Sequence, residues 1–159
     1  MILSYLILAH LLGDFIFQPT KLVEWKIKKK KGIFIHSLIH FLITAILLLP
    51  FLIAGYFWLL IIIFAISFIH FFIDSTKVKY GIKNRKNGKA KPFIIDQIFH
   101  FLVIFIAYLA ISDIEITFPE TLFYKVYTDA RVITLAYIIV FVILLIGIFR
   151  FKKKPSGHY

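Results

Sequence analysis

The hydrophobic pattern of this chain consists of long apolar segments separated by short polar connections. Five such segments can be placed, at about residues 1–19, 33–54, 56–77, 92–112 and 131–151. Each is close to the roughly 20 apolar residues that a helix needs to cross the hydrocarbon core of a bilayer. The pattern therefore predicts an all-α fold, an integral membrane bundle of five transmembrane helices.

Composition agrees with this pattern. Hydrophobic residues make up 61% of the 159 positions, against about 45–50% in soluble domains, and the excess has to face lipid. The first segment has the length of a signal peptide but lacks a basic start and a small-residue cleavage site, so we expect it to be retained. Five membrane helices leave no room for a second domain.

The distribution of basic residues predicts the orientation in the membrane. Of the 19 Lys and Arg residues, 17 lie in the connections after segments one, three and five. The positive-inside rule places these connections in the cytoplasm, the N-terminus outside and the C-terminus inside. The net charge of +11 is then topology information beside anionic lipid headgroups, and we expect no nucleic-acid partner.

These observations predict a multi-pass protein of the inner cell membrane. The expected parts are a four-helix membrane core at 1–112, an external loop at 113–130, a fifth transmembrane helix at 131–151 and a basic cytoplasmic tail at 152–159. Membrane lipid is the expected partner, and assembly into a homo-oligomer is left open.

Four of the five segments each contain two ionisable residues spaced four apart. The pairs are His10 with Asp14, His36 with His40, His70 with Asp74, and Asp96 with His100. Four residues are about one helical turn, so both members of a pair project from the same helix face. Charged groups inside a membrane cost about 2.5–3.5 kcal/mol each even on the insertion scale. A shared metal would offset this cost, so we expect all eight to be metal ligands.

The depth of these residues supports one shared site. Asp14, His36, Asp74 and Asp96 lie three or four residues from the cytoplasmic ends of their segments, and their partners lie one turn deeper. This predicts two layers, about 5 and 11 Å inside the boundary. Because the chain has no Cys, the ligands are nitrogen and oxygen. We expect one or two divalent ions, zinc first, with manganese or iron as alternatives.

Several neighbouring polar residues extend the predicted site. Gln18 lies one turn beyond Asp14 and Gln97 adjoins Asp96, so both could hydrogen-bond to the ligands and orient them. Lys77 is expected at the cytoplasmic mouth, where it either contacts a phosphate or oxyanion or extends to the interface as an ordinary end residue. Asp14 or Asp96, if not fully used as a ligand, could serve as general base.

The motifs that carry these residues are AHLLGDFIFQP, HSLIH, HFFIDSTK and DQIFH, between about residues 9 and 100. In these motifs the chain resembles an uncharacterised bacterial membrane family known only as a domain of unknown function. The pattern is also similar to that of the predicted inner-membrane metal-dependent hydrolases, which carry comparable HxxxH and HxxxD pairs. The resemblance marks the eight paired residues together with Gln18, Lys77 and Gln97, and it implies metal-dependent hydrolysis.

We therefore expect an intramembrane metal-dependent hydrolase with a cytoplasm-facing site, acting on a lipid or polyprenyl phosphate or ester. No GxSxG motif or other nucleophile motif is present in the sequence, so water is the expected attacking group. The alternatives are a divalent metal transporter or sensor, a di-iron or haem redox protein, and a purely structural polar network. The apolar outer halves of the segments disfavour transport, because an ion path would continue through them.

Overall fold

The computed structural model describes residues 1–83 and 90–152, with side chains described for 1–80 and 94–145. In these ranges the chain is helical and contains no strand, which confirms the all-α prediction. The elements are α1 (Ile2–Leu11), the π-helical turn η1 (Leu12–Ile16), α2 (Thr20–Lys28), α3 (Lys30–Leu47), α4 (Leu49–Ile53), α5 (Leu59–Lys83), α6 (Ala90–Leu109), α7 (Leu122–Thr128) and α8 (Ala130–Lys152).

The described helices include two that are long and apolar enough to cross a membrane, within α3 and α5. Two bent pairs could each make one further span: α1 and η1 with α2, at an angle of 88°, and α7 with α8, at 54°. The structure thus has two to four candidate spans and is compatible with a membrane protein. The count of five spans and the orientation stay predictions.

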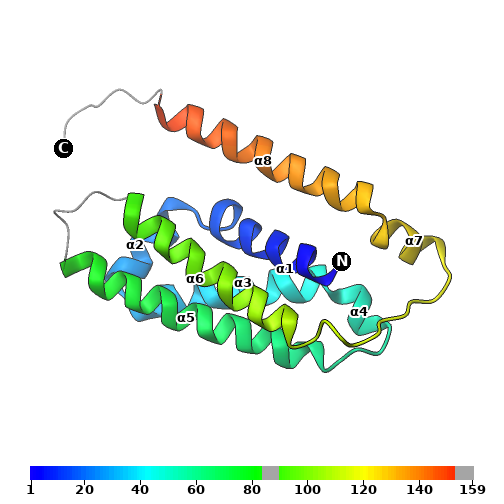
Figure 1. Cartoon of the computed structure of the whole chain (residues 1–159). Coiled ribbons are helices and arrows are strands. Elements are labelled where there is room, and N and C mark those ends of the chain that lie inside the picture. The colour runs from blue at the N-terminus through cyan, green and yellow to red at the C-terminus, as the bar shows by residue number, and fades with distance from the viewer. Residues whose placement is uncertain (84–89, 153–159) are drawn as a thin grey trace.

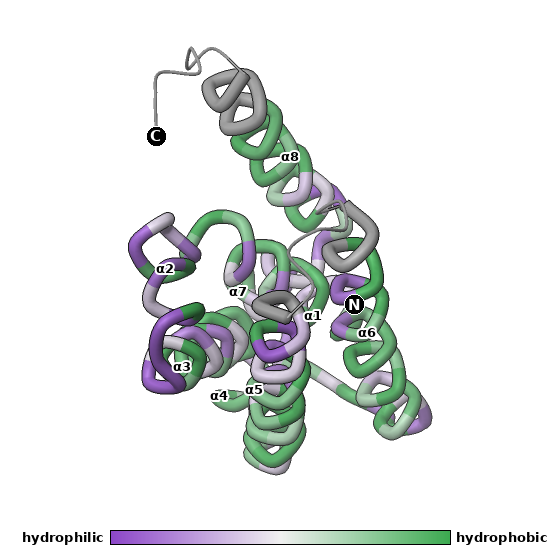
Figure 2. Tube along the Cα trace, turned by 90° about the vertical axis from the view of Figure 1, so that its left-hand side faces the viewer, coloured by the Kyte–Doolittle hydropathy of each residue, from purple (hydrophilic) through white to green (hydrophobic). Residues whose placement is uncertain are grey.

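The four segments that carry the ionisable pairs form a bundle. α3 packs against α5 and α1, and α6 packs against α5 and α1, so α1, α3, α5 and α6 lie side by side (Figure 1). α8 packs along α1 and η1, where the hydroxyl of Tyr137 donates to the carbonyl of Ser4 at 2.6 Å. Figure 2 shows that the described part of α8 lies apart from α3 and α5.

The apolar core lies at the end of the bundle near α4 and α7. Its centre includes Phe51 and Ile63, both fully buried. α7 covers this end: the Tyr127 ring stacks on Tyr5 with centroids 4.5 Å apart, and its hydroxyl donates to the carbonyl of Leu47 at 2.7 Å. Large aromatic faces bury much apolar area while each hydroxyl keeps a partner. This packing closes the bundle at one end and leaves the histidines toward the other.

The structure differs from the sequence prediction at the breaks between elements. Residues 20–28, expected as part of a connection, form α2, which runs across the bundle after the bend at Pro19. The expected 33–54 segment is divided at Leu48, and Pro50, which has no amide hydrogen to donate, lies at the start of α4. The expected external loop contains α7. The expected tail after Lys152 and part of the connection before α6, at 84–89, lie outside the described residues.

Candidate metal centre

The eight paired residues converge on one buried region between α1, η1, α3, α5 and α6. His10, His36, His40, His70, Asp74, Asp96 and His100 are each at most 5% exposed, and the side chain of Asp14 is 10% exposed. The fold therefore brings the paired residues of all four sequence motifs into one place. Ionisable groups this deeply buried need partners or a bound ion to offset the loss of hydration.

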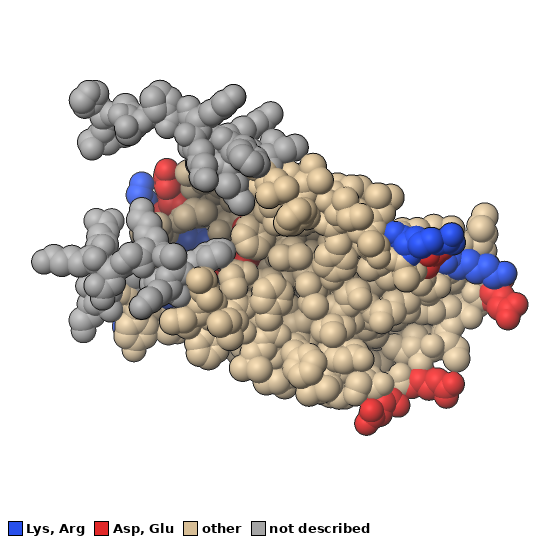
Figure 3. All heavy atoms as spheres, turned by 45° about the horizontal axis from the view of Figure 1, so that its top comes forward, with Lys and Arg blue, Asp and Glu red and all other residues tan. Residues whose placement is uncertain are grey.

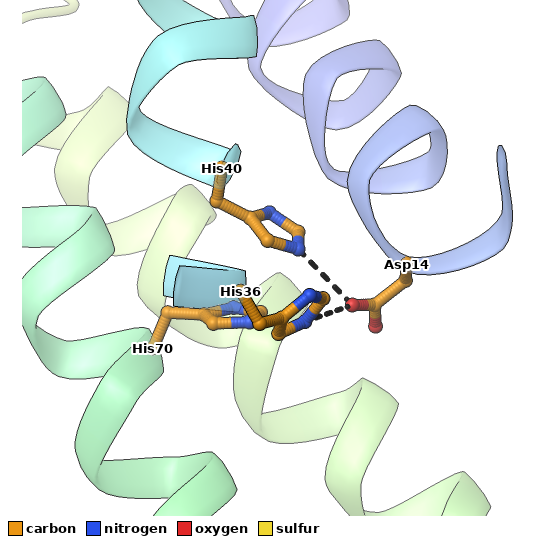
Figure 4. A group of neighbouring side chains, drawn as sticks. All are labelled: Asp14, His36, His40 and His70. Carbon is orange, nitrogen blue, oxygen red and sulfur yellow. Dashed lines mark hydrogen bonds and ion pairs between the residues drawn. The ribbon is translucent and has the colours of Figure 1, made fainter. Parts of the chain in front are cut away.

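The first candidate ligand set consists of Asp14, His36, His40 and His70. One ligand atom from each lies within 4.8 Å of the others. Nε2 of His36 and Nε2 of His40 are each 3.1 Å from Oδ1 of Asp14, as Figure 4 shows. Ligands about 2.0–2.1 Å from a tetrahedral zinc ion lie roughly 3.4 Å apart. The observed spacing is therefore close to that of a tetrahedral centre with three imidazoles and one carboxylate.

The second candidate set consists of His70, Asp74 and His100, and it shares His70 with the first. Nδ1 of His100 donates to the carbonyl oxygen of Asp96 at 2.8 Å, so in the neutral imidazole Nε2 carries a lone pair. Among the described residues, Nε2 of His100 and Nε2 of His70 have no hydrogen-bond partner. Buried nitrogen atoms without a partner are costly, and a metal ion would satisfy them.

The predicted inner layer meets at one small cavity. His10, His40, His70 and His100 all line it, and its volume is about 10 Å³, room for about one water molecule. The predicted outer layer is not a separate ligand set. Asp14 and His36, expected there, combine with His40 and His70 of the inner layer, because one oxygen of Asp14 lies 3.1 Å from both His36 and His40.

Gly13 determines how closely His40 approaches the first helix. A Cβ atom at position 13 would lie 2.4 Å from Cε1 of His40, which is a severe overlap. The imidazole therefore occupies the space that any other side chain would fill. Gly13 lies in η1, and π-helical turns of this kind are frequent at functional sites. The sequence signal was a lone glycine inside an apolar segment, one position before Asp14.

The two glutamines contact candidate ligands, and their role as orienting groups stays a prediction. Nε2 of Gln97 donates to Oδ2 of Asp14 at 2.9 Å, and its Oε1 lies 3.2 Å from Nε2 of His10. Nε2 of Gln18 lies 2.9 Å from Nε2 of His36. His10 is outside both candidate ligand sets, and its contact with Gln97 places it among the groups that surround the ligands.

Asp96 is also outside both sets. The Lys77 ammonium donates to its Oδ2, while Oδ1 is buried and has no hydrogen-bond partner among the described residues. The Lys77 side chain is 39% exposed and the Asp96 side chain 3% exposed. The ion pair therefore extends from a partly exposed ammonium group at the surface to a buried carboxylate beside the centre.

Lys26 is a site residue that sequence reasoning missed. The sequence predicts that Lys26, like the other lysines of its connection, only sets the orientation in the membrane. In the structure, however, it is only 7% exposed and forms an ion pair with Asp74. Leu22 is buried on the same face of α2. The four-residue spacing of Leu22 and Lys26 could have indicated a shared buried face. It does so only if residues 20–28 form a helix that packs against the bundle, which the sequence analysis did not predict.

The close packing of α2 on α3 holds Lys26 in place. A Cβ atom on Gly32 would lie 2.5 Å from the backbone nitrogen of Lys26 and 2.5 Å from the carbonyl carbon of Trp25. Only a glycine allows this approach. Among the described residues, and with neutral imidazoles, the three carboxylates and two lysine ammonium groups of the centre leave one excess negative charge, which favours binding of a cation.

Comparison with known proteins identifies the family. The chain belongs to the family described as "Protein of unknown function (DUF3307)", whose model matches residues 2–129. No curated protein and no solved structure matches the chain. The expected membership of an uncharacterised family is confirmed, whereas the similarity to hydrolases stays a prediction. The matched range contains every residue of the centre and ends before α8.

Proposed function

We propose that this member of the DUF3307 family is an intramembrane metal-dependent hydrolase. The observation that carries the proposal is the buried set of Asp14, His36, His40 and His70, whose ligand atoms lie within 4.8 Å of one another. Three nitrogen ligands and one carboxylate suit zinc, with manganese or iron as alternatives. A catalytic metal also needs a position for a water molecule, and the adjoining cavity lined by His70 and His100 would provide it.

The proposed topology has five membrane helices, with the N-terminus outside and the site open to the cytoplasm. The concentration of Lys and Arg in the connections near the site supports it. On the face shown in Figure 3, acidic and basic side chains gather toward the two ends, with other residues between them. This distribution is typical of a protein whose middle is surrounded by lipid.

Different residues of the chain would hold the metal, accept a proton and bind the substrate. A divalent ion held by the first set would lower the pKa of a bound water to near 7 and polarise a phosphoryl or carbonyl oxygen. Oδ1 of Asp96 is buried, lies 3.8 Å from Nδ1 of His100 and has no hydrogen-bond partner among the described residues. It is our first choice for the general base, with Asp14 as the second. Lys77, which is partly exposed, would bind a phosphate or ester oxygen.

The substrate class follows from the position of the centre within an apolar bundle. A soluble substrate would have to leave water to reach it, whereas the polar end of a lipid is already at that depth. We therefore propose a lipid or polyprenyl phosphate or ester. The packed core around Phe51 and Ile63 closes the opposite end of the bundle and favours hydrolysis over transport of a metal across the membrane.

The decisive experiment begins with elemental analysis of the detergent-purified protein beside a His40→Ala/Asp74→Ala double variant. We expect at least one zinc, manganese or iron per chain in the wild type and a loss in the variant. Equal metal in both would overturn the metal centre. Release of phosphate or fatty acid from a lipid panel then tests hydrolysis. Metal uptake into proteoliposomes without lipid turnover would show a transporter instead.

A further inference from the structure

We infer that the centre binds a single metal ion and that the ammonium group of Lys26 takes the place of a second one. The inference rests on the proposed metal centre and specifies its composition. The metal would lie in the set Asp14, His36, His40 and His70. Asp74, which could otherwise help His100 to hold a second ion, is instead neutralised by a cation that the chain itself supplies.

The first support is the ion pair between Lys26 and Asp74. The two side chains are 8% and 3% exposed, so a buried carboxylate is paired with a buried ammonium group. The same carboxylate oxygen, Oδ2 of Asp74, lies 3.5 Å from Nε2 of His36 and 3.7 Å from Nε2 of His70. Lys26 thus reaches the oxygen that faces the histidines, and a divalent ion bound there would be repelled at short range.

The second support is the sharing of His70. Both candidate sets require a nitrogen of this imidazole, and its Nε2 is without a hydrogen-bond partner among the described residues. A neutral imidazole carries one lone pair and binds one metal ion. The two sets therefore cannot be complete at the same time. The first set keeps three other ligands when it takes His70, whereas the second set without it keeps two.

The third support is how firmly the chain holds Lys26 in place. α2 lies at 88° to the first helix. Because Gly32 of α3 has no side chain, the backbone of α2 at Trp25 and Lys26 can lie directly against α3. A lysine that served only as a topology signal would extend toward water, as long basic side chains at membrane ends usually do. Lys26 instead extends inward from a helix that otherwise exposes Lys21 and Lys28.

This arrangement gives the centre two positive groups of different kinds. The metal ion would activate water, and the ammonium group would stabilise negative charge on a substrate oxygen without needing a second metal. The electrostatic role of the ammonium group resembles that of the second ion in two-metal sites.

Lys77, which pairs with Asp96 outside both candidate ligand sets, provides a matched comparison because it also forms an ion pair with a buried aspartate.

The test is the metal content of the full-length protein in detergent after equilibration with zinc and removal of free metal. We expect one zinc per chain in the wild type, in Lys26→Arg and in the matched control Lys77→Met. We expect two in Lys26→Met, where Asp74 and His100 would hold the second ion with water in the place of His70. Methionine keeps the apolar volume of the lysine stem and removes only the charge. Two zinc ions in the wild type, or one in a folded Lys26→Met, would overturn the inference.

A titration of the wild type with cobalt(II) keeps the inference testable if Lys26→Met fails to fold. The visible absorption of bound cobalt should rise to one equivalent and then stop, and a rise that continues to two equivalents would overturn the inference. A wild type that binds no metal would remove the proposed centre altogether. That outcome differs from a wild type that binds two ions, which would leave the proposed function intact and eliminate only the role of Lys26.

Discussion

The side-chain amide of Gln97 on α6 donates a 2.9 Å hydrogen bond to Oδ2 of Asp14 on η1. One carboxylate oxygen is thereby occupied, and the other, Oδ1, is left facing His36 and His40 at 3.1 Å. The amide thus determines which oxygen is presented to the candidate metal. Hydrogen bonds of this type fix the orientation of ligands and raise metal affinity.

We predict that Gln97→Leu lowers the affinity for zinc by about 10- to 100-fold, the usual effect of removing a group that orients a ligand. The reason is that the Asp14 carboxylate can then rotate away from the histidines. Competition with a chelator of known affinity measures the change. An unchanged affinity in a helical, monodisperse variant would show that Asp14 is positioned without Gln97.

Replacement of Asp14 itself should have a larger effect. We expect Asp14→Asn to lower zinc affinity by more than the roughly 100-fold upper range for orienting groups, because a charged ligand is lost while the shape is kept. Asp113→Asn is the control with the same chemical change, since Asp113 is exposed and follows the last residue of the site, His100, in the sequence. Equal zinc affinity in the two variants would remove Asp14 from the ligand set.

Gly13→Ala tests the close approach of His40. The added Cβ would lie 2.4 Å from Cε1 of the imidazole, so the ring must move and one ligand is displaced. We expect zinc affinity to fall by about 10-fold or more. Gly55→Ala should instead lower stability and leave zinc binding unchanged, because Gly55 has φ of 98° but open space around its Cβ in the described structure. Wild-type affinity in Gly13→Ala would contradict the packing described.

The orientation can be tested by labelling single cysteines, since the chain has none of its own. In intact cells, an impermeant maleimide should label Glu120→Cys and leave Lys29→Cys unlabelled, because the basic connection is predicted to be cytoplasmic. Both positions are exposed, so differences in burial do not explain the contrast. Labelling of Lys29→Cys alone would reverse the proposed topology and move the site to the outer side.

The hydrogen bond between Tyr137 and the carbonyl of Ser4 should contribute to the docking of α8. We expect Tyr137→Phe to lower the free energy of unfolding by about 1 kcal/mol, measured by denaturation in mixed micelles, with no change in zinc affinity. The separation of the two readouts matters because α8 supplies none of the candidate ligands. A loss of zinc binding would show that α8 supports the centre through α1.

The sequence by itself determined the helical class, the apolar segments and the eight paired residues that meet at the centre. These features are local. Membrane helices require a minimum apolar length, and a four-residue spacing places two side chains on one face whatever the neighbouring helices do. Six of the eight predicted ligands, from Asp14 to His100, accordingly fall in the two candidate sets.

Only the tertiary structure decided which of these residues meet. The sharing of His70, the placement of Lys77 on Asp96 and the burial of Lys26 beside Asp74 depend on the rotation of each helix and on the 88° bend before α2. These are contacts between elements distant in sequence, set by packing at positions such as Gly13 and Gly32. Residue spacing along one helix carries no information about them, because they are determined by the shapes of the facing surfaces.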